Sequence, residues 1–116
     1  MKIVTACKQG LVRSVGLADV LKMHFEPVDV IPIGLNSNSC GTIRMLSEWC
    51  DWFIIMEERY RSRVPDEFII RPKLLVCDVG QDRYGNSHNP ELIDQCWRWC
   101  RANQAKIGIR EHQKKI

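Results

Sequence analysis

Short apolar runs alternate with longer segments of mixed polarity along the 116 residues of the chain. Four of these runs have the length and the bulky or β-branched side chains of buried strands; they are residues 2–6, 28–33, 52–56 and 73–77. The segments from about 14 to 25, 42 to 49 and 57 to 64 lie between them and are predicted to be helical. Strands that alternate with helices predict an α/β fold with a parallel sheet and right-handed crossovers.

The last predicted helix has the clearest boundary signals. Asn89 is a good N-cap, and Pro90 suits the first turn, where a missing N–H costs nothing. Apolar side chains then recur on one broad face, at Leu92, Ile93, Cys96, Trp97 and Cys100. Segments 34–41 and 78–89 have the composition of loops, and about 104–116 is expected to be a frayed basic tail.

The composition is that of one globular domain over residues 1–116, with 45% apolar and 27% charged residues. A net charge of +3 is too mild to indicate nucleic-acid binding. No apolar stretch could span a membrane and the N-terminus lacks a signal-peptide core, so we expect a cytoplasmic protein without membrane contact. The six cysteines are then expected to be reduced. Because the chain has no Cys-x-x-Cys pair and its histidines are scattered, we expect no metal site and no cofactor.

Cys7 and the 78–89 loop are expected to lie at the same edge of such a sheet. Cys7 lies at the carboxyl end of the first strand, and the 78–89 loop follows the fourth strand. Ligands of open parallel sheets bind outside the carboxyl ends of the strands. The sequence therefore places Cys7 and the 78–89 loop where a functional site is expected.

The segment from Cys7 to Ser14, "CKQGLVRS", connects the first strand to the first helix. A turn of this kind leaves backbone N–H groups unpaired at a positive helix end, which favours binding of an anion. Gly10 supplies backbone freedom, and the planar fork of Arg13 can hold two phosphate oxygens at once. The same positive field favours the ionised Cys7 thiol as a nucleophile, and Ser14 could donate to its sulfur. The alternative from the residues alone is that Cys7 only packs in the core.

This segment resembles the phosphate loop of the low-molecular-weight protein tyrosine phosphatases. The stretch "WCDWFIIMEERYRSRV" (49–64) resembles that family's strand ending in Met and an acid. The stretch "LLVCDVGQDRYGNSHNPELI" (74–93) is similar to the end of a compact subgroup of predicted tyrosine phosphatases. The resemblance implies a three-layer sandwich whose four-stranded parallel sheet has the order 2-1-3-4. That fold is flavodoxin-like and typical of phosphotyrosine phosphatases.

The resemblance also implies a mechanism. The Cys7 thiolate would attack phosphorus, Arg13 would stabilise the equatorial oxygens, and Asp82 would protonate the leaving oxygen. Asp78 competes for the acid role but is expected to brace the loop instead. The substrate would be a phosphorylated protein or a small aryl phosphate, with a phosphate- or sulfate-type oxyanion in the loop. Substrate contacts are expected from Lys8, Gln9, Gly10, Leu11, Val12, Ser14 and Tyr84.

The chain departs from the family at three positions. Gly10 stands where the family usually has asparagine, Val12 where a second cysteine is common, and Arg83 where the acid loop has proline. The segment around 34–41 also looks shorter than the family's insert that contacts substrate. These departures bear on catalytic efficiency and specificity rather than on the reaction itself.

Three other functions remain open at this stage. The chain also resembles the phosphocysteine carriers of sugar-transport IIB proteins, where Gly10 fits well but Arg13 does not. A thiol-dependent arsenate reductase would need a resolving thiol such as Cys96 or Cys100, although both are expected to pack in the core. A non-catalytic domain would bind oxyanions without turnover. The arginines that follow the third strand, Arg59, Arg61 and Arg63, either line the cleft or form a solvated face.

Overall fold

A computed structural model of the chain describes residues 1–63 and 73–112. Its main sheet has four parallel strands in the order β3-β1-β4-β5, formed by β1 (Lys2–Cys7), β3 (Asp29–Gly34), β4 (Trp52–Ile55) and β5 (Leu74–Val76). Numbered by their place in the chain, these are the predicted strands in the predicted order 2-1-3-4. The α/β sandwich is therefore confirmed, and Pro32 lies in the edge strand β3, where a missing N–H is tolerated.

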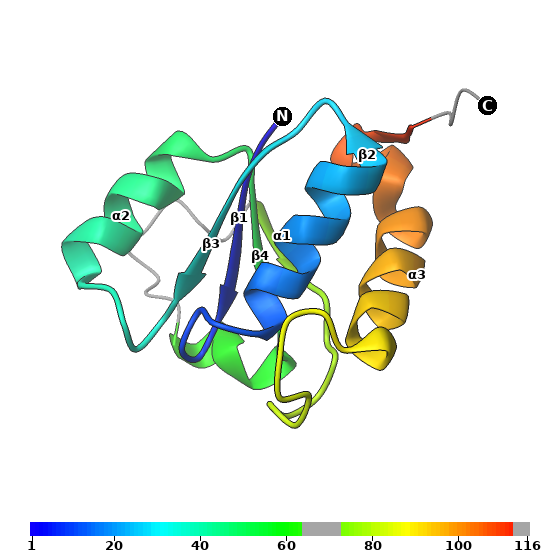
Figure 1. Cartoon of the computed structure of the whole chain (residues 1–116). Helices are drawn as coiled ribbons and strands as arrows, with labels where there is room; N and C mark the ends of the chain where they lie inside the picture. Colours follow the sequence, from blue (N-terminus) through cyan, green and yellow to red (C-terminus); the bar gives the residue numbers. More distant parts are fainter. Residues whose placement is uncertain (64–72, 113–116) are drawn as a thin grey trace.

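Helices cover both faces of this sheet. Helix α2 (Cys40–Trp49) lies on one face, and α1 (Arg13–His24) and α3 (Pro90–Ile107) lie side by side on the other (Figure 1). A short 3-10 helix, η1 (Glu58–Arg63), follows β4. No helix in residues 1–63 and 73–112 is both long and apolar enough to cross a membrane.

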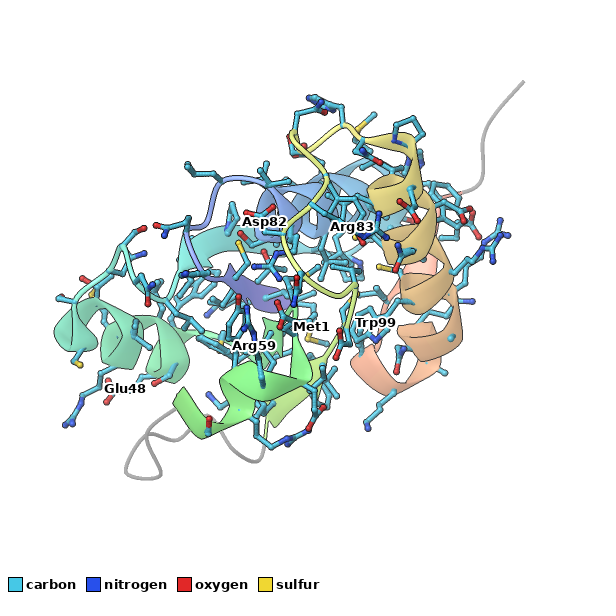
Figure 2. The ribbon with its side chains drawn as sticks, turned by 90° about the horizontal axis from the view of Figure 1, so that it is seen from below. Met1, Glu48, Arg59, Asp82, Arg83 and Trp99 are labelled. Carbon is cyan, nitrogen blue, oxygen red and sulfur yellow. The ribbon has the colours of Figure 1, made fainter. Side chains whose placement is uncertain are left out.

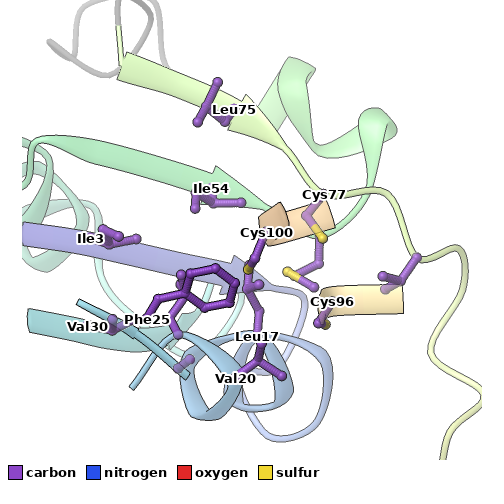
Figure 3. Packing of buried hydrophobic residues seen from close by; sticks show 14 of the residues in the cluster. Ile3, Leu17, Val20, Phe25, Val30, Ile54, Leu75, Cys77, Cys96 and Cys100 are labelled. Carbon is purple, nitrogen blue, oxygen red and sulfur yellow. The ribbon is translucent and has the colours of Figure 1, made fainter. Parts of the chain in front are cut away.

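The core consists of two apolar layers, one on each face of the sheet. The layer between the sheet and the α1–α3 pair includes Ile3, Leu17, Ile54, Leu92 and Cys96, all with no exposed surface. Figure 3 shows this packing at close range. The opposite layer, under α2, is built around Val4, Phe53 and Ile55. Because β1 and β4 are central and buried on both faces, their continuous apolar runs are explained by their position.

The capping signal at the start of α3 was predicted correctly, whereas the start of α2 was not. The Asn89 side chain accepts hydrogen bonds from Glu91 N–H and Leu92 N–H, and Pro90 occupies the first turn of α3, as predicted. Helix α2 begins two residues earlier than predicted because the Ser39 hydroxyl caps it, accepting from Thr42 N–H at 3.2 Å.

The end of the chain differs from the prediction of a frayed tail. Helix α3 continues to Ile107, Gly108 turns the chain at φ +88°, and β6 (Arg110–Glu111) pairs antiparallel with β2 (Phe25–Glu26). The prediction of a tail from residue 104 is therefore wrong as far as Glu111. The physical reason is that Ile107 and Ile109 are buried against the core. Residues 113–116 lie outside the described residues.

Candidate active site

The phosphate-loop segment lies at the carboxyl edge of the sheet, between the end of β1 and the start of α1 (Figure 1). Cys7 is only 3% exposed, and its thiol donates a hydrogen bond to the Ser14 hydroxyl at 3.2 Å. The N–H of Gly10 donates to the same sulfur, also at 3.2 Å. The predicted contact between Cys7 and Ser14 is present, with the neutral thiol as donor. Ionisation of the thiol would reverse that hydrogen bond, because a thiolate can only accept.

The carbonyl groups of this loop are tied to the segment that follows β3. Leu35 N–H donates to the Cys7 carbonyl at 2.8 Å, and Asn36 N–H donates to the Lys8 carbonyl at 2.9 Å. The Ser37 hydroxyl donates to the Gln9 carbonyl at 3.0 Å. Residues 35–37 therefore hold the loop's acceptors away from an incoming anion.

The loop amides have the opposite character. Among the described residues, the N–H groups of Lys8, Gln9 and Leu11 have no hydrogen-bond acceptor within the protein. The N–H of Gly10 already points to the Cys7 sulfur. Unpaired backbone donors in a loop that leads into a helix are the groups that bind phosphate-like anions.

Gly10 has a structural explanation that the sequence did not reveal. Its φ is +75°, and a Cβ at this position would lie 2.4 Å from the Gly34 nitrogen and 2.6 Å from the Ile33 carbonyl carbon. A Cβ at Gly34 would in turn lie 2.3 Å from the Gln9 carbonyl carbon. The loop and the end of β3 thus approach through two glycines, and an asparagine at position 10 would collide with backbone. Gly10, which stands where the resembling family usually has asparagine, is therefore explained by its close contact with Gly34.

Arg13 is almost completely buried, at 1% exposed. Its Nη1 donates to the Glu57 carboxylate at 2.5 Å and to the Gly80 carbonyl at 2.8 Å, and its Nη2 donates to the Tyr60 hydroxyl at 2.8 Å. Burial alone would lower the pKa of this guanidinium, but the hydrogen bonds to Tyr60 and Glu57 outweigh burial and raise it. Arg13 is therefore held in its charged form at the base of the site.

Three of the five guanidinium N–H donors are thus used inside the protein. The sequence predicted that the fork of Arg13 would face the phosphate, yet part of that fork is bound to Glu57, to Tyr60 of η1 and to the loop after β5. Arg13 Nε is buried and has no partner among the described residues, and one N–H on Nη2 also remains. These two donors are the ones available to an oxyanion.

The loop after β5 contains both candidate acids, and they differ in their contacts. The Asp78 carboxylate accepts from Glu58 N–H at 3.0 Å and from Gly80 N–H at 2.9 Å. Asp78 therefore braces the loop, as expected. Asp82 is exposed and has no hydrogen-bond or ion-pair partner among the described residues. Figure 2 views the molecule from the carboxyl edge and shows Asp82 on one side of β1 and Arg59 on the other.

Tyr84 was expected among the substrate contacts, but the structure places it elsewhere. Its side chain is 4% exposed and packs in the core, and its hydroxyl donates to the Val79 carbonyl. The Gln95 side chain donates to the same hydroxyl at 3.0 Å. Tyr84 offers almost no surface to a substrate in this conformation, and it fastens the end of the loop to α3.

Glu57 and Tyr60 are two site residues whose role was not predicted from the sequence. Both directly contact Arg13 from the segment after β4. The signal that could have found them is their position, because the carboxyl end of a central parallel strand faces the same edge as Cys7. The family's Met-acid pattern pointed to Glu57 without giving it a role.

Cys96 and Cys100, the candidate resolving thiols, form a buried cluster with Cys77. Cys77, Cys96 and Cys100 are at most 1% exposed and lie close together between β5 and α3 (Figure 3). The pKa of Cys77 is raised by its hydrogen bond with Cys96 and by burial, and burial raises the pKa of Cys100. The expected packing role is confirmed by this burial, and thiols with raised pKa values are poor nucleophiles.

Comparison of the sequence with protein families and with curated proteins gives no match. Comparison of the structure with solved structures gives several matches. The chain aligns with a low-molecular-weight protein tyrosine phosphatase from Bacillus subtilis at TM-score 0.62 and 11% identity, over 90% of this chain and 98% of the other. It aligns with the YwlE arginine phosphatase from Geobacillus stearothermophilus at TM-score 0.59 and 13% identity, over 99% of both chains.

A third neighbour is Vibrio vulnificus Wzb in complex with benzylphosphonate, at TM-score 0.56 and 15% identity, over 92% of this chain and 97% of that one. At identities this low, the similarity establishes a common fold, and the reaction is inferred from the residues of this chain. The fold predicted from the phosphate-loop segment and its neighbours is confirmed over nearly the whole length. The chain has the three-layer α/β fold of the low-molecular-weight protein tyrosine phosphatases.

Proposed function

We propose that this protein is a cysteine-dependent phosphatase that hydrolyses phosphotyrosine or another aryl phosphate through a phosphocysteine intermediate. The observation that carries the proposal is the surrounding of Cys7. Its sulfur is contacted by Gly10 N–H and by Ser14. Among the described residues, three amides of the same loop and the Nε of Arg13 have no partner, and the Arg13 charge interacts with Cys7. The similar structures from Geobacillus stearothermophilus and Bacillus subtilis are phosphatases, which supports the same assignment.

In the first step, the Cys7 thiolate forms a bond to phosphorus while the bond to the leaving oxygen breaks. Asp82 gives its proton to that oxygen, since it is the carboxylate of the loop after β5 that has no partner in residues 1–63 and 73–112. The loop amides and Arg13 stabilise the charge on the equatorial oxygens. In the second step, Asp82 takes a proton from the attacking water and the thiolate leaves, with the Ser14 hydroxyl donating to the sulfur.

Leu11 supports an aryl substrate. Its side chain is 73% exposed although it lies in the phosphate loop, so it provides an apolar surface at the mouth of the site. A phenyl ring on the phosphate would bury part of that surface, whereas a guanidinium would not gain from it. The related Wzb is known with an aryl ligand, benzylphosphonate. YwlE is an arginine phosphatase, which makes phosphoarginine the competing substrate.

The direct test is hydrolysis of p-nitrophenyl phosphate by the wild type and by Cys7→Ser. We expect turnover that disappears in the variant, and faster hydrolysis of phosphotyrosine than of phosphoarginine. Equal rates for wild type and Cys7→Ser would refute the proposal. Phosphate transfer from a histidine-phosphorylated donor without hydrolysis would support a phosphocysteine carrier instead.

The arsenate-reductase alternative has its own test. A variant in which Cys77, Cys96 and Cys100 are replaced by alanine or serine lacks the possible resolving thiols. Phosphatase activity that survives in proportion to the folded fraction excludes a mechanism that depends on them. Arsenate reduction by the wild type that disappears in this variant would favour the reductase.

A further inference from the structure

A small hollow lies next to the phosphate loop, on the side of η1. Its volume is about 180 Å³, and it is lined by Lys8, Arg59, Tyr60 and Ser62. The hydroxyl of Tyr60 accepts the hydrogen bond from Arg13 Nη2 at 2.8 Å. The Tyr60 side chain therefore separates the hollow from the Arg13 guanidinium. Lys8 lines the hollow and also belongs to the phosphate loop.

The charges around the hollow are unevenly matched. The Glu57 carboxylate serves two guanidinium groups at once, Arg13 and Arg59. Glu58, the next carboxylate along η1, is paired with Arg61 at 2.7 Å, and Asp78 binds backbone N–H groups. Lys8 has no ion-pair partner among the described residues. Two guanidinium groups thus share one carboxylate, and the Lys8 ammonium has no carboxylate among the described residues, so positive charge remains for an incoming anion.

Arg59 is suitably placed to contribute that charge. Its side chain is 60% exposed, and its guanidinium lies 5.4 Å from the centre of the Tyr60 ring. Stacking on the ring and pairing with Glu57 orient the group while part of it remains open to solvent. The result is a preformed cationic wall, with the Lys8 ammonium as a second, more flexible charge.

We propose that Lys8 and Arg59 form a subsite for the carboxylate of an acidic side chain next to the phosphorylated residue. The preferred substrates are then phosphotyrosyl segments flanked by Glu or Asp. Adjacent residues of an extended peptide lie only about 3.8 Å apart at Cα, so a flanking side chain reaches a hollow one side chain away from the phosphate loop. This inference rests on the proposed function, because the phosphorylated residue must occupy the loop.

Binding of non-hydrolysable peptides tests the subsite separately from turnover. The probes are two fluorescent peptides containing phosphonomethyl-phenylalanine, one flanked on both sides by Glu and the other by Gln. At low salt we expect the Glu peptide to bind wild type roughly fivefold to tenfold more tightly, since each exposed ion pair is worth a few-fold in Kd. Raising the salt from about 0.02 M to 0.5 M should remove most of the difference by screening.

The variants separate direct contact from general charge. In the double variant Lys8→Gln/Arg59→Gln, the ratio of the two Kd values should fall to about one. Arg61→Gln is the matched control, because it removes one charge from the same 3-10 helix without lining the hollow. It should keep most of the preference for the Glu peptide.

Each outcome decides between the claims. Equal binding of the two peptides by wild type overturns the subsite, as does a preference that survives in Lys8→Gln/Arg59→Gln or is lost equally in Arg61→Gln. Hydrolysis of p-nitrophenyl phosphate is measured in parallel. Hydrolysis without peptide preference leaves the proposed function intact and removes the subsite. Preference for the Glu peptide without any hydrolysis retains the subsite as a binding site and removes the phosphatase.

Discussion

The phosphate loop and the loop after β5 reach the same edge of the sheet but are held in different ways. In the phosphate loop, three consecutive carbonyls are hydrogen-bonded to residues 35–37, and Gly10 lies against Gly34. In the loop after β5, Asp78 and Tyr84 fasten the two ends, while Asp82 between them has no partner among the described residues. The proposed nucleophile and anion donors are thus fixed in place, and the proposed acid is free to approach a leaving group.

The buried ion pair that joins the two halves of the site should give the largest effect. Glu57→Gln leaves the buried Arg13 charge without its carboxylate, which we expect to cost about 3–5 kcal/mol of unfolding free energy. Urea denaturation measures this cost. Glu58→Gln is the matched control, because its exposed pair with Arg61 should contribute less than about 1 kcal/mol. Equal effects of the two substitutions would contradict the role given to Glu57.

The close approach of Gly10 to Gly34 predicts the next largest effect. Gly10→Ala places a Cβ against backbone that cannot yield without moving the loop, so we expect kcat/KM for p-nitrophenyl phosphate to fall by about 100-fold or more. Gly85→Ala is the control, since Gly85 also has a positive φ, +80°, but a Cβ added there would meet nothing within 4 Å. A Gly10→Ala enzyme of near-normal activity would show that the loop is not rigid.

The different contacts of the two acids predict different consequences. Asp82→Asn should lower kcat for a phenyl phosphate by about 100-fold, and less for p-nitrophenyl phosphate, whose leaving group needs less protonation. It should also remove the high-pH limb of the rate profile. Asp78→Asn should mainly lower stability, by about 1 kcal/mol, because it weakens two hydrogen bonds to backbone N–H groups. The reverse pattern would make Asp78 the acid.

Tyr84→Phe should have the smallest effect. The substitution removes the hydroxyl that donates to the Val79 carbonyl, so we expect a stability loss of about 1 kcal/mol and KM within a factor of about two of wild type. Thermal unfolding and steady-state kinetics measure the two quantities. A large rise in KM with unchanged stability would instead place Tyr84 against the substrate.

Much of this architecture could be predicted because it depends on local patterns. The strands of the main sheet are apolar runs, and the α3 cap is a two-residue signal at Asn89 and Pro90. The pairing of β2 with β6 could not be predicted, because two-residue strands have no periodicity and depend on burial of Ile107 and Ile109.

The same limit applies to the site. The nucleophile segment is continuous in sequence, so Cys7, Arg13 and Ser14 could be recognised together. The partners of Arg13 come from two distant segments, and their hydrogen bonds exist only once the sheet has formed. The reason for Gly10 in place of the usual asparagine could not be predicted either, because it depends on Gly34 at the end of another strand.

The central claim is that the fixed loop supplies the nucleophile and the free carboxylate supplies the acid and base. The most direct measurement is acid quenching of Asp82→Asn during turnover of p-nitrophenyl phosphate, followed by mass spectrometry of the intact protein and its peptides. Loss of the base slows hydrolysis of the intermediate, so we predict one added phosphoryl group on Cys7 and none in Asp82→Asn/Cys7→Ser. Turnover with the phosphoryl group on another residue, or with none on Cys7, would contradict the account.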